Sequence, residues 1–239
     1  MTILSIITIT NGDLAPLERT VSSFHSNESV EWIVISSMDS FPTDLRKPDL
    51  FIGNESNGIF SALNLGLEKS KGELIVFMHA GDEFYAPDTI SKVIESWFAQ
   101  RWKWAVGNTH LQTQDGKLWR YPSAQSLQFL FGTNSFCHQA MYCETQLLRK
   151  LGGFNEAFLG ADWALMLKLS QENTPVLLNF PVAIYEHGGF STRQNYLQEC
   201  SQKHLARVYY GVNLKPLCLD LLLQFVLTFM SRLIQKARG

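Results

Sequence analysis

The sequence predicts an α/β fold with a mostly parallel central sheet flanked by helices. Over the first hundred residues, β-branched apolar runs alternate with segments whose apolar residues recur at helical spacing. One apolar run, residues 74–78, is followed directly by His79-Ala80-Gly81-Asp82-Glu83. Such a run is typical of a strand buried on both faces of a parallel sheet. Carboxylates that follow its carboxyl end lie where open α/β sheets bind ligands.

Strands are expected where short β-branched or apolar runs occur, because these side chains fit a half-buried or buried sheet. The expected strands cover residues 4–10, 30–36, 51–53, 73–78, 104–107, 118–121, 140–142 and 176–180. The fifth and sixth of these strands could form a hairpin.

Helices are expected where apolar residues recur every three or four positions, as Leu17, Val21 and Phe24 do. Pro87 favours a helix start, because its fixed φ suits the first turn. The expected helices cover residues 14–24, 58–69, 87–97, 145–151 and 162–171.

Composition limits the function classes. The chain has 239 residues, of which 46% are hydrophobic, and its net charge is −2, which argues against a bulk nucleic-acid partner. Its four cysteines form no CxxC pair, so zinc and thioredoxin-like sites are disfavoured. Residues 1–7 contain no basic leader and no cleavage signal, and no apolar run is long enough to span a bilayer. We therefore expect a cytoplasmic protein.

The charge divides unevenly along the chain. Residues 1–202 contain 14 Lys/Arg and 21 Asp/Glu, a net charge of −7, whereas residues 203–239 contain six basic residues and one acid, a net charge of +5. Polar residues form one narrow stripe along 216–238, which predicts an amphipathic helix. We expect a main domain at 1–200 and a basic helical appendage at 201–239. The helix could bind an anionic membrane surface, or pack on the domain or on a second subunit in a homodimer.

Two nucleotide-binding patterns are missing from the sequence. The first expected strand is followed by Asn11-Gly12-Asp13-Leu14-Ala15-Pro16, whose single glycine does not fit the GxGxxG fingerprint of dinucleotide-binding domains. There is no Walker A sequence either.

Several segments, taken in order, resemble inverting family-2 glycosyltransferases of the GT-A fold. The resemblance runs from about residue 3 to about residue 192, and no single motif decides it. The matching segments are Thr8-Ile9-Thr10-Asn11, Glu31-Trp32-Ile33-Val34-Ile35, Asn57-Gly58-Ile59-Phe60-Ser61-Ala62-Leu63-Asn64-Leu65-Gly66, residues 71–83, Cys137-His138-Gln139-Ala140, Leu151-Gly152-Gly153-Phe154-Asn155-Glu156 and Gly160-Ala161-Asp162-Trp163.

The resemblance implies a metal-dependent enzyme that moves a sugar from a nucleoside-diphosphate-sugar donor to a hydroxyl with inversion. Asp82 matches the second acid of the family's metal-binding motif, with Gly81 in the place of the first. Asp82 would thus hold Mn²⁺ or Mg²⁺, whose remaining ligands can be phosphate oxygens and water. Asp162 matches the family's general base, although Asp at a helix start is also a common N-cap.

The resemblance also implies three groups of contact residues. Expected donor contacts are Thr8, Thr10, Asn11, Ser36, Asn57, Gly58, Asn64, Ala80 and Gly81. Expected acceptor or sugar contacts are His138, Gln139 and Trp163. The expected diphosphate loop contains His187, Gly188 and Gly189.

Three departures from the family pattern affect the donor half of the site. Ser36, Ser56 and Ser61 stand where the family usually has acids. Serine can bond a base or ribose, but without the strength of a charged acceptor. A UDP-sugar donor is favoured by the resemblance and put in doubt by these serines. The alternatives are a non-catalytic GT-A-like binding protein and, with less support, a nucleotidyltransferase.

The expected biological setting follows from the resemblance and from the basic appendage. The acceptor would be a glycan or a lipid-linked glycan in surface polysaccharide or glycolipid synthesis. Contact of 216–238 with the membrane surface would then place the enzyme at the inner face of the plasma membrane.

Overall fold

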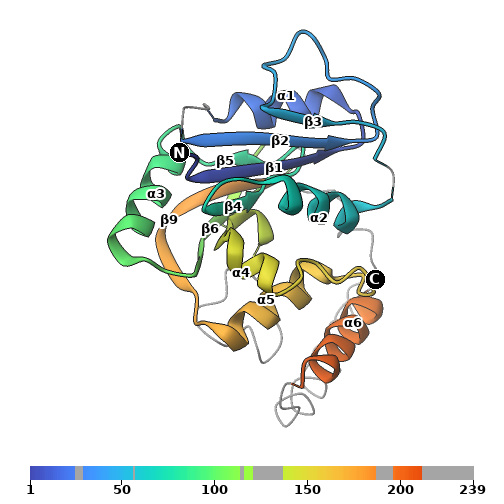
Figure 1. Cartoon of the computed structure of the whole chain (residues 1–239), viewed down its shortest axis with the longest axis vertical. Helices are drawn as coiled ribbons and strands as arrows, with labels where there is room; N and C mark the ends of the chain where they lie inside the picture. The colour runs from blue at the N-terminus through green and yellow to red at the C-terminus, as the bar shows by residue number, and fades with distance from the viewer. Residues whose placement is uncertain (25–28, 56, 114–115, 121–136, 187–195, 212–239) are drawn as a thin grey trace, which may run out of the picture.

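Figure 1 shows the computed structural model, in which a twisted sheet is flanked by helices. The structure describes residues 1–211 except for 25–28, 56, 114–115, 121–136 and 187–195. Among the described residues a nine-stranded sheet has the order β3-β2-β1-β4-β8-β6-β9-β5, and β7 pairs with β6. The expected α/β class is confirmed.

The first half of the sheet is parallel. Its strands are β3 (Leu50–Ile52), β2 (Val30–Ser36), β1 (Leu4–Thr10) and β4 (Leu74–Phe77), in that spatial order. β1 pairs in parallel register with β2 and β4, and β2 does so with β3. All of β4 is buried, as its continuous apolar sequence predicts. The carboxyl ends of these strands therefore face one edge of the sheet.

The second half of the sheet is mixed. β8 (Met141–Glu144) runs antiparallel to both β4 and β6 (Trp104–Gln112). β9 (Val176–Glu186) is parallel to β6 and antiparallel to the short β5 (Glu83–Phe84). The expected hairpin is confirmed, because β7 (Leu118–Arg120) pairs antiparallel with β6. Parallel pairing therefore builds the first half of the sheet, and antiparallel pairing brings β8 beside β4.

Helices cover the sheet and extend below it in Figure 1. Their bounds are α1 (Leu14–Ser22), α2 (Ile59–Lys69), α3 (Thr89–Gln100), α4 (Thr145–Lys150), α5 (Ala161–Glu172) and α6 (Tyr196–Tyr209). A short 3₁₀ turn, η2, covers His138–Ala140 directly before β8. None of the helices in the described part of the chain combines the length and apolar composition needed to cross a bilayer.

α6 crosses the boundary expected at residue 200. Ala206 and Arg207 of this helix are buried, and the Arg207 guanidinium lies 5.1 Å from the centre of the Trp163 ring on α5. The first part of the expected appendage is therefore packed on the main domain. The predicted amphipathic helix at 216–238 lies outside the described residues.

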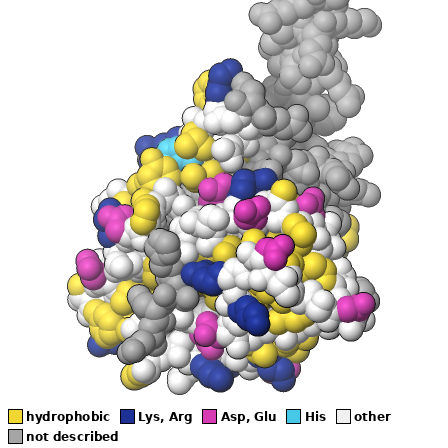
Figure 2. All heavy atoms as spheres, turned by 90° about the horizontal axis from the view of Figure 1, so that it is seen from above, with side chains coloured by type: hydrophobic (Ala, Val, Ile, Leu, Met, Phe, Trp, Pro, Cys, Tyr) yellow, Lys and Arg dark blue, Asp and Glu magenta, His cyan; other side chains and the backbone are white. Residues whose placement is uncertain are grey.

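Charged side chains are mixed on the face of the molecule that Figure 2 shows. Basic and acidic side chains lie interspersed with apolar ones over the described surface in that view. That face does not gather charge of a single sign, as a surface built for a polyanion would.

Candidate active site

The segments that follow the parallel strands meet at one edge of the sheet. After β1 and β2, the Ser37 hydroxyl donates to the Asn11 carbonyl oxygen at 3.2 Å. After β1 and β4, the Ala80 N–H donates to the Ile9 carbonyl oxygen at 3.0 Å. The His79–Asp82 segment therefore lies beside the end of β1, as expected for a site at the carboxyl edge.

The His79–Asp82 turn is held by a buried hydroxyl on α1. The Asp82 N–H donates to the His79 carbonyl oxygen at 3.0 Å, and Gly81 has φ of 105°, a backbone conformation that glycine adopts without strain. The Thr20 hydroxyl accepts from the Gly81 N–H at 2.9 Å and donates to the Asp82 carbonyl oxygen at 2.7 Å. Thr20 therefore fixes the direction in which the Asp82 side chain leaves the turn.

The Asp82 carboxylate is 4% exposed and receives a hydrogen bond from Gln139. The distance from Gln139 Nε2 to Asp82 Oδ2 is 2.8 Å. The other end of the Gln139 amide accepts from Cys137 Sγ at 2.7 Å, which sets the amide orientation. Gln139, predicted to contact acceptor or sugar, is buried here and orients Asp82.

A chain of hydrogen bonds joins this turn to Asp162. His79 Nε2 lies 3.2 Å from His138 Nε2, and His138 Nδ1 lies 3.2 Å from Asp162 Oδ2. With both rings neutral, one arrangement satisfies every contact: His79 donates to His138, and His138 donates to Asp162. Asp162 lies in the first turn of α5 and keeps about a third of its side chain exposed. Its carboxylate is therefore both oriented and accessible.

The charges in this chain follow from its surroundings. Burial lowers the pKa of His79 to about 3, with a further lowering from His138 and an opposing contribution from Asp162. Burial by itself would raise the pKa of Asp162, but the hydrogen bond from His138, the attraction of that ring when it is protonated, and the Trp163 N–H outweigh it, so this pKa is lowered. At neutral pH the site thus contains a neutral His79 and an ionised Asp162.

The residues at this site can hold a divalent cation only if a bound ligand supplies further oxygen atoms. No group of three or more His, Cys, Asp or Glu side chains with metal-binding geometry occurs in the described part of the chain. Asp82 supplies one hard carboxylate at the sheet edge, and Mg²⁺ or Mn²⁺ can complete its sphere with phosphate oxygens and water. The residues present therefore fit a cation shared with a diphosphate.

Several predicted donor contacts are already engaged within the protein. The Thr8 side chain is fully buried, and its hydroxyl accepts from Trp32 Nε1 at 3.0 Å. Ser36 is 2% exposed, and its hydroxyl accepts from the Met38 N–H at 3.0 Å. The Thr10 hydroxyl accepts from the Gly12 N–H at 3.1 Å. Thr8 therefore belongs to the core, and the Ser36 hydroxyl stabilises the turn after β2.

Asn64 and Trp163 also differ from their predicted roles. The Asn64 amide donates to the Phe154 carbonyl oxygen at 2.9 Å and to Glu156 Oε1 at 3.2 Å, and its oxygen accepts from the Phe154 N–H at 2.8 Å. This side chain joins α2 to the loop before α5, so its contacts do not support a donor role. Trp163 is 4% exposed and packs beneath α6, so in this structure it is part of the core.

The remaining predicted residues divide into two groups. Asn11, Asn57 and Gly58 are exposed at the carboxyl edge, or in the loop leading into α2, and they stay candidates for donor contact. His187, Gly188 and Gly189, the predicted diphosphate loop, lie outside the described residues, as does Ser56.

Sequence reasoning missed two residues that organise the site. Thr20 gives no signal in the sequence, because its partners lie about 60 positions away. His79 stands within the motif, and its pairing with His138 depends on the antiparallel placement of β8 beside β4. A polar aromatic residue directly after a buried strand was the only available hint.

Comparison of the sequence with known protein families places the chain among glycosyltransferases. The family described as "Glycosyl transferase family 2" matches residues 5–168, more than half of the chain. The protein therefore belongs to glycosyl transferase family 2, whose members transfer a sugar from a donor. It is 28% identical over 205 residues, 80% of its own length and 78% of the relative's, to an uncharacterized glycosyltransferase of Mycobacterium tuberculosis.

Solved structures of glycosyltransferases share the fold. One is Staphylococcus aureus TarS 1-349 in complex with UDP-GlcNAc, with a TM-score of 0.60 and 14% identity; the match covers 81% of this chain and 62% of that one. Another is the mannosyltransferase PcManGT of Pyrobaculum calidifontis with GDP-Man and Mn²⁺, with a TM-score of 0.55, 17% identity, and coverage of 86% and 69%. The chain thus spans less than two thirds of the TarS fragment.

Replacing Thr20 by Val should destabilise the protein by about 1–3 kcal/mol, because the turn loses the hydroxyl's hydrogen bonds with the Gly81 N–H and the Asp82 carbonyl oxygen, each worth about 0.5–1.5 kcal/mol, while side-chain shape is kept. Urea denaturation gives the free energy of unfolding. Thr20→Ser is the matched control, since it keeps the hydroxyl and loses one buried methyl group, worth about 1 kcal/mol. Equal stability of Thr20→Val and the wild type would show that the hydroxyl does not hold the turn.

The protein should be less stable in mild acid, because its unfolded form takes up a proton at His79 more readily than its folded form does. The His79 pKa of about 3 in the folded chain lies below the ordinary 6.5, so the unfolded chain binds the proton more readily. The stability from neutral His79 is complete above pH 6.5 and is lost as pH falls toward 3, by up to about 1.4 kcal/mol per pH unit. His79→Gln should flatten the plot of unfolding free energy between pH 6.5 and 4.5. An unchanged slope would contradict the assignment.

Proposed function

We propose that the protein is a metal-dependent, inverting glycosyltransferase that moves a sugar from a nucleoside-diphosphate-sugar donor to an acceptor hydroxyl. The observation that supports this most is the hydrogen-bonded chain from the Asp82 turn through His79 and His138 to Asp162. It sets two carboxylates, with different surroundings, at the same edge of the sheet. Asp82 is suited to holding a cation, and Asp162 is suited to accepting a proton.

Asp162 would act as the general base. The acceptor hydroxyl attacks the anomeric carbon, the bond from that carbon to the diphosphate oxygen breaks, and the hydroxyl proton passes to the Asp162 carboxylate. The lowered pKa of Asp162 keeps it ionised and able to accept this proton. His138, predicted to contact acceptor or sugar, would instead orient the carboxylate through its Nδ1–H. A direct displacement of this kind inverts the anomeric centre.

Asp82 would hold the divalent cation together with the donor. When bound, Mn²⁺ or Mg²⁺ supplies positive charge that offsets the charge developing on the departing diphosphate. Gln139 and Thr20 keep the Asp82 carboxylate in place for this role. The presence of Mn²⁺ in the structures of PcManGT and of GalNAc-T7 supports the same requirement here.

The identity of the nucleobase in the sugar donor needs a direct test. TarS structures contain UDP or UDP-GlcNAc, and the PcManGT structure contains GDP-Man. Because the Ser36 hydroxyl is engaged by the Met38 N–H, it does not favour uridine over another base. We propose a UDP-sugar donor on the family resemblance, and a glycan or lipid-linked glycan as acceptor. Contact of 216–238 with the membrane surface belongs to the same proposal.

A thermal-shift screen tests the proposed function. The full chain is heated with UDP, GDP, CDP, ADP or TDP, each with and without Mn²⁺, because a ligand that binds the folded state raises the unfolding temperature. The expected result is a shift for one base that depends on Mn²⁺. Donor hydrolysis with sugars on that base then identifies the sugar. No shift with any nucleotide would contradict the donor site.

Asp82→Asn should remove the Mn²⁺-dependent part of the nucleotide thermal shift and abolish sugar transfer. The amide is neutral, so it loses the charge that attracts the cation. Glu83→Gln is the matched control, because it removes one charge from the neighbouring position and should leave the shift in place. If Asp82→Asn kept the full Mn²⁺-dependent shift in unfolding temperature, the metal site would have to lie elsewhere.

Asp162→Asn should lower kcat by about 10²–10⁴, the usual contribution of a positioned base, while the nucleotide thermal shift stays as in the wild type. Initial rates with a saturating donor measure the change. Glu172→Gln, at the other end of α5 and in an exposed ion pair with Lys150, serves as the control and should retain activity. Loss of donor binding with intact turnover would rule out the base role.

A further inference from the structure

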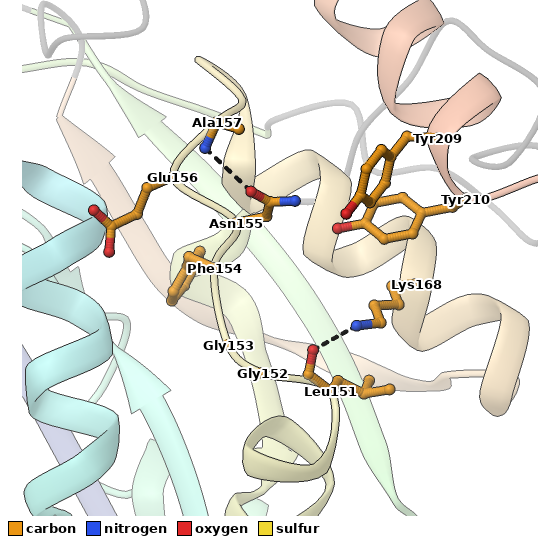
Figure 3. A pocket seen from close by; sticks show the side chains of 10 residues that line it. All are labelled: Leu151, Gly152, Gly153, Phe154, Asn155, Glu156, Ala157, Lys168, Tyr209 and Tyr210. Atoms are coloured by element: carbon orange, nitrogen blue, oxygen red, sulfur yellow. Dashed lines mark hydrogen bonds between the residues drawn. The ribbon is translucent and has the colours of Figure 1, made fainter.

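A concave site lies between the loop that precedes α5, α5 itself and the end of α6. A pocket of about 400 Å³ is formed by the loop 151–157, by α5 and by the end of α6 (Figure 3). Its lining includes none of the residues assigned above to the metal, the base or the donor. It is therefore a separate feature whose chemistry needs its own explanation.

Two tyrosines at the end of α6 form one wall of this pocket. The rings of Tyr209 and Tyr210 lie 5.0 Å apart and are perpendicular, and both contact the buried Phe158 ring, at 5.5 and 6.0 Å. Tyr209 is 68% exposed. An aromatic ring held in place yet open to solvent offers an apolar face without being needed for the core.

Hydrogen-bond donors form the opposite wall. Asn155 Oδ1 accepts from the Ala157 N–H at 3.1 Å, while Asn155 Nδ2 has no partner among the described residues and points toward the tyrosine hydroxyls in Figure 3. Lys168 Nζ donates to the Leu151 carbonyl oxygen and has two further hydrogens. The Glu156 side chain points away toward α2, where it accepts from Asn64. The polar side chains that face the pocket are therefore mainly donors, because the carboxylate in its lining, Glu156, is turned toward α2.

The walls are tied to the body of the protein. Asn64 fixes the loop to α2 through both backbone groups of Phe154. Gln202 Oε1 on α6 accepts from the Leu159 N–H at 3.3 Å, and Gln171 Nε2 on α5 donates to the Tyr210 carbonyl oxygen at 3.0 Å. A site already held in shape loses little conformational entropy when a ligand binds.

We propose that this pocket binds a sugar ring of the acceptor glycan, away from the hydroxyl that reacts. This inference rests on the proposed function, since it assigns a substrate class to that enzyme. A sugar ring has an apolar C–H face that can lie on Tyr209, and hydroxyls that accept from Asn155 Nδ2 and Lys168 Nζ and bond the tyrosine hydroxyls. The combination of an apolar wall and a few placed polar groups is typical of small-molecule sites.

Other ligand classes fit less well. A cationic ligand meets Lys168, while the carboxylate of the lining, Glu156, is turned toward α2 and accepts from Asn64. A purely apolar ligand would bury the Asn155 amide without a partner, which costs free energy. An anion finds a single lysine, already bonded to the Leu151 carbonyl oxygen, which gives little charge for recognition.

α5 connects the pocket to the proposed base. Asp162 is in its first turn and Lys168 follows six residues later, about 9 Å further along the helix axis and about 120° around it. A short oligosaccharide can bridge this distance. The pocket would therefore favour acceptors of several sugar units over a single sugar.

Binding of oligosaccharides to the full chain tests this proposal. An array of neutral and uronic-acid oligosaccharides identifies the best-bound neutral compound, and isothermal titration then measures its Kd and that of inorganic phosphate. Asn155→Asp keeps the acceptor for the Ala157 N–H and removes the amide donors, and Tyr209→Ala removes the exposed ring. Each should raise the Kd for the oligosaccharide about tenfold, as expected for one lost contact. Leu205→Ala, 51% exposed on α6 and outside the pocket, is the matched control and should bind as the wild type does.

The possible outcomes distinguish the proposed sugar pocket from the proposed enzymatic function. Weaker binding in both pocket variants but not in Leu205→Ala supports the sugar site. Failure of every oligosaccharide to bind, an equal loss in the control, or displacement of the oligosaccharide by phosphate would overturn it. The nucleotide thermal shift is measured on the same wild-type sample. If the nucleotide raises the unfolding temperature but no oligosaccharide binds, the pocket proposal alone is wrong. If an oligosaccharide binds through the pocket but no nucleotide raises the unfolding temperature, the pocket proposal is supported and the proposed enzymatic function is wrong.

Discussion

The candidate site depends on one register, the antiparallel pairing of β8 with β4. Val76 lies opposite Tyr142, and Ile75 lies opposite Cys143. This register places η2, which directly precedes β8, beside the turn that directly follows β4. A slip of one residue would turn every side chain of β8 to the other face of the sheet. The burial of β4 and β8 prevents such a slip, because their apolar side chains would lose the core.

Once this register is set, the polar side chains of η2 have few possible hydrogen-bond partners. Gln139 reaches Asp82, and His138 lies between His79 and Asp162. Burial keeps His79 neutral, which allows it to donate to the neighbouring ring without adding a second positive charge beside a cation site. The same histidine pair leaves Asp162 ionised. The geometry of the sheet thus determines the protonation of His79 and Asp162, and Asp162 keeps the charge that its proposed role requires.

The fold class could be predicted from the sequence because it depends on local signals, and the two candidate carboxylates stand in equally local motifs. The continuous apolar run of β4 and the acid after it are visible over a few residues, and the matches around Asp162 are equally compact. The mixed half of the sheet was not foreseen, since antiparallel pairing of β8 joins residues about 70 positions apart. β5 is two residues long and has no periodicity to detect.

The predicted contacts that differ do so for a common physical reason. Thr8, Ser36 and Asn64 carry polar side chains that could bind a ligand, and each instead satisfies a group of the protein itself. A buried polar group needs a partner, so the chain uses hydroxyls and amides near the site to hold the loops that build it. Whether a polar side chain near a strand end faces a ligand or a neighbouring loop depends on tertiary contacts that no short motif records.

The α5 helix links the two sites. Its first turn carries Asp162, its buried face carries Trp163 under α6, and Lys168 lies in the second pocket. Packing of α6 on this helix therefore has two consequences. It secures the helix that presents the proposed base, and it brings Tyr209 and Tyr210 over the loop that precedes that helix. The segment after residue 200, which sequence analysis separated from the catalytic domain, therefore completes a pocket on that domain.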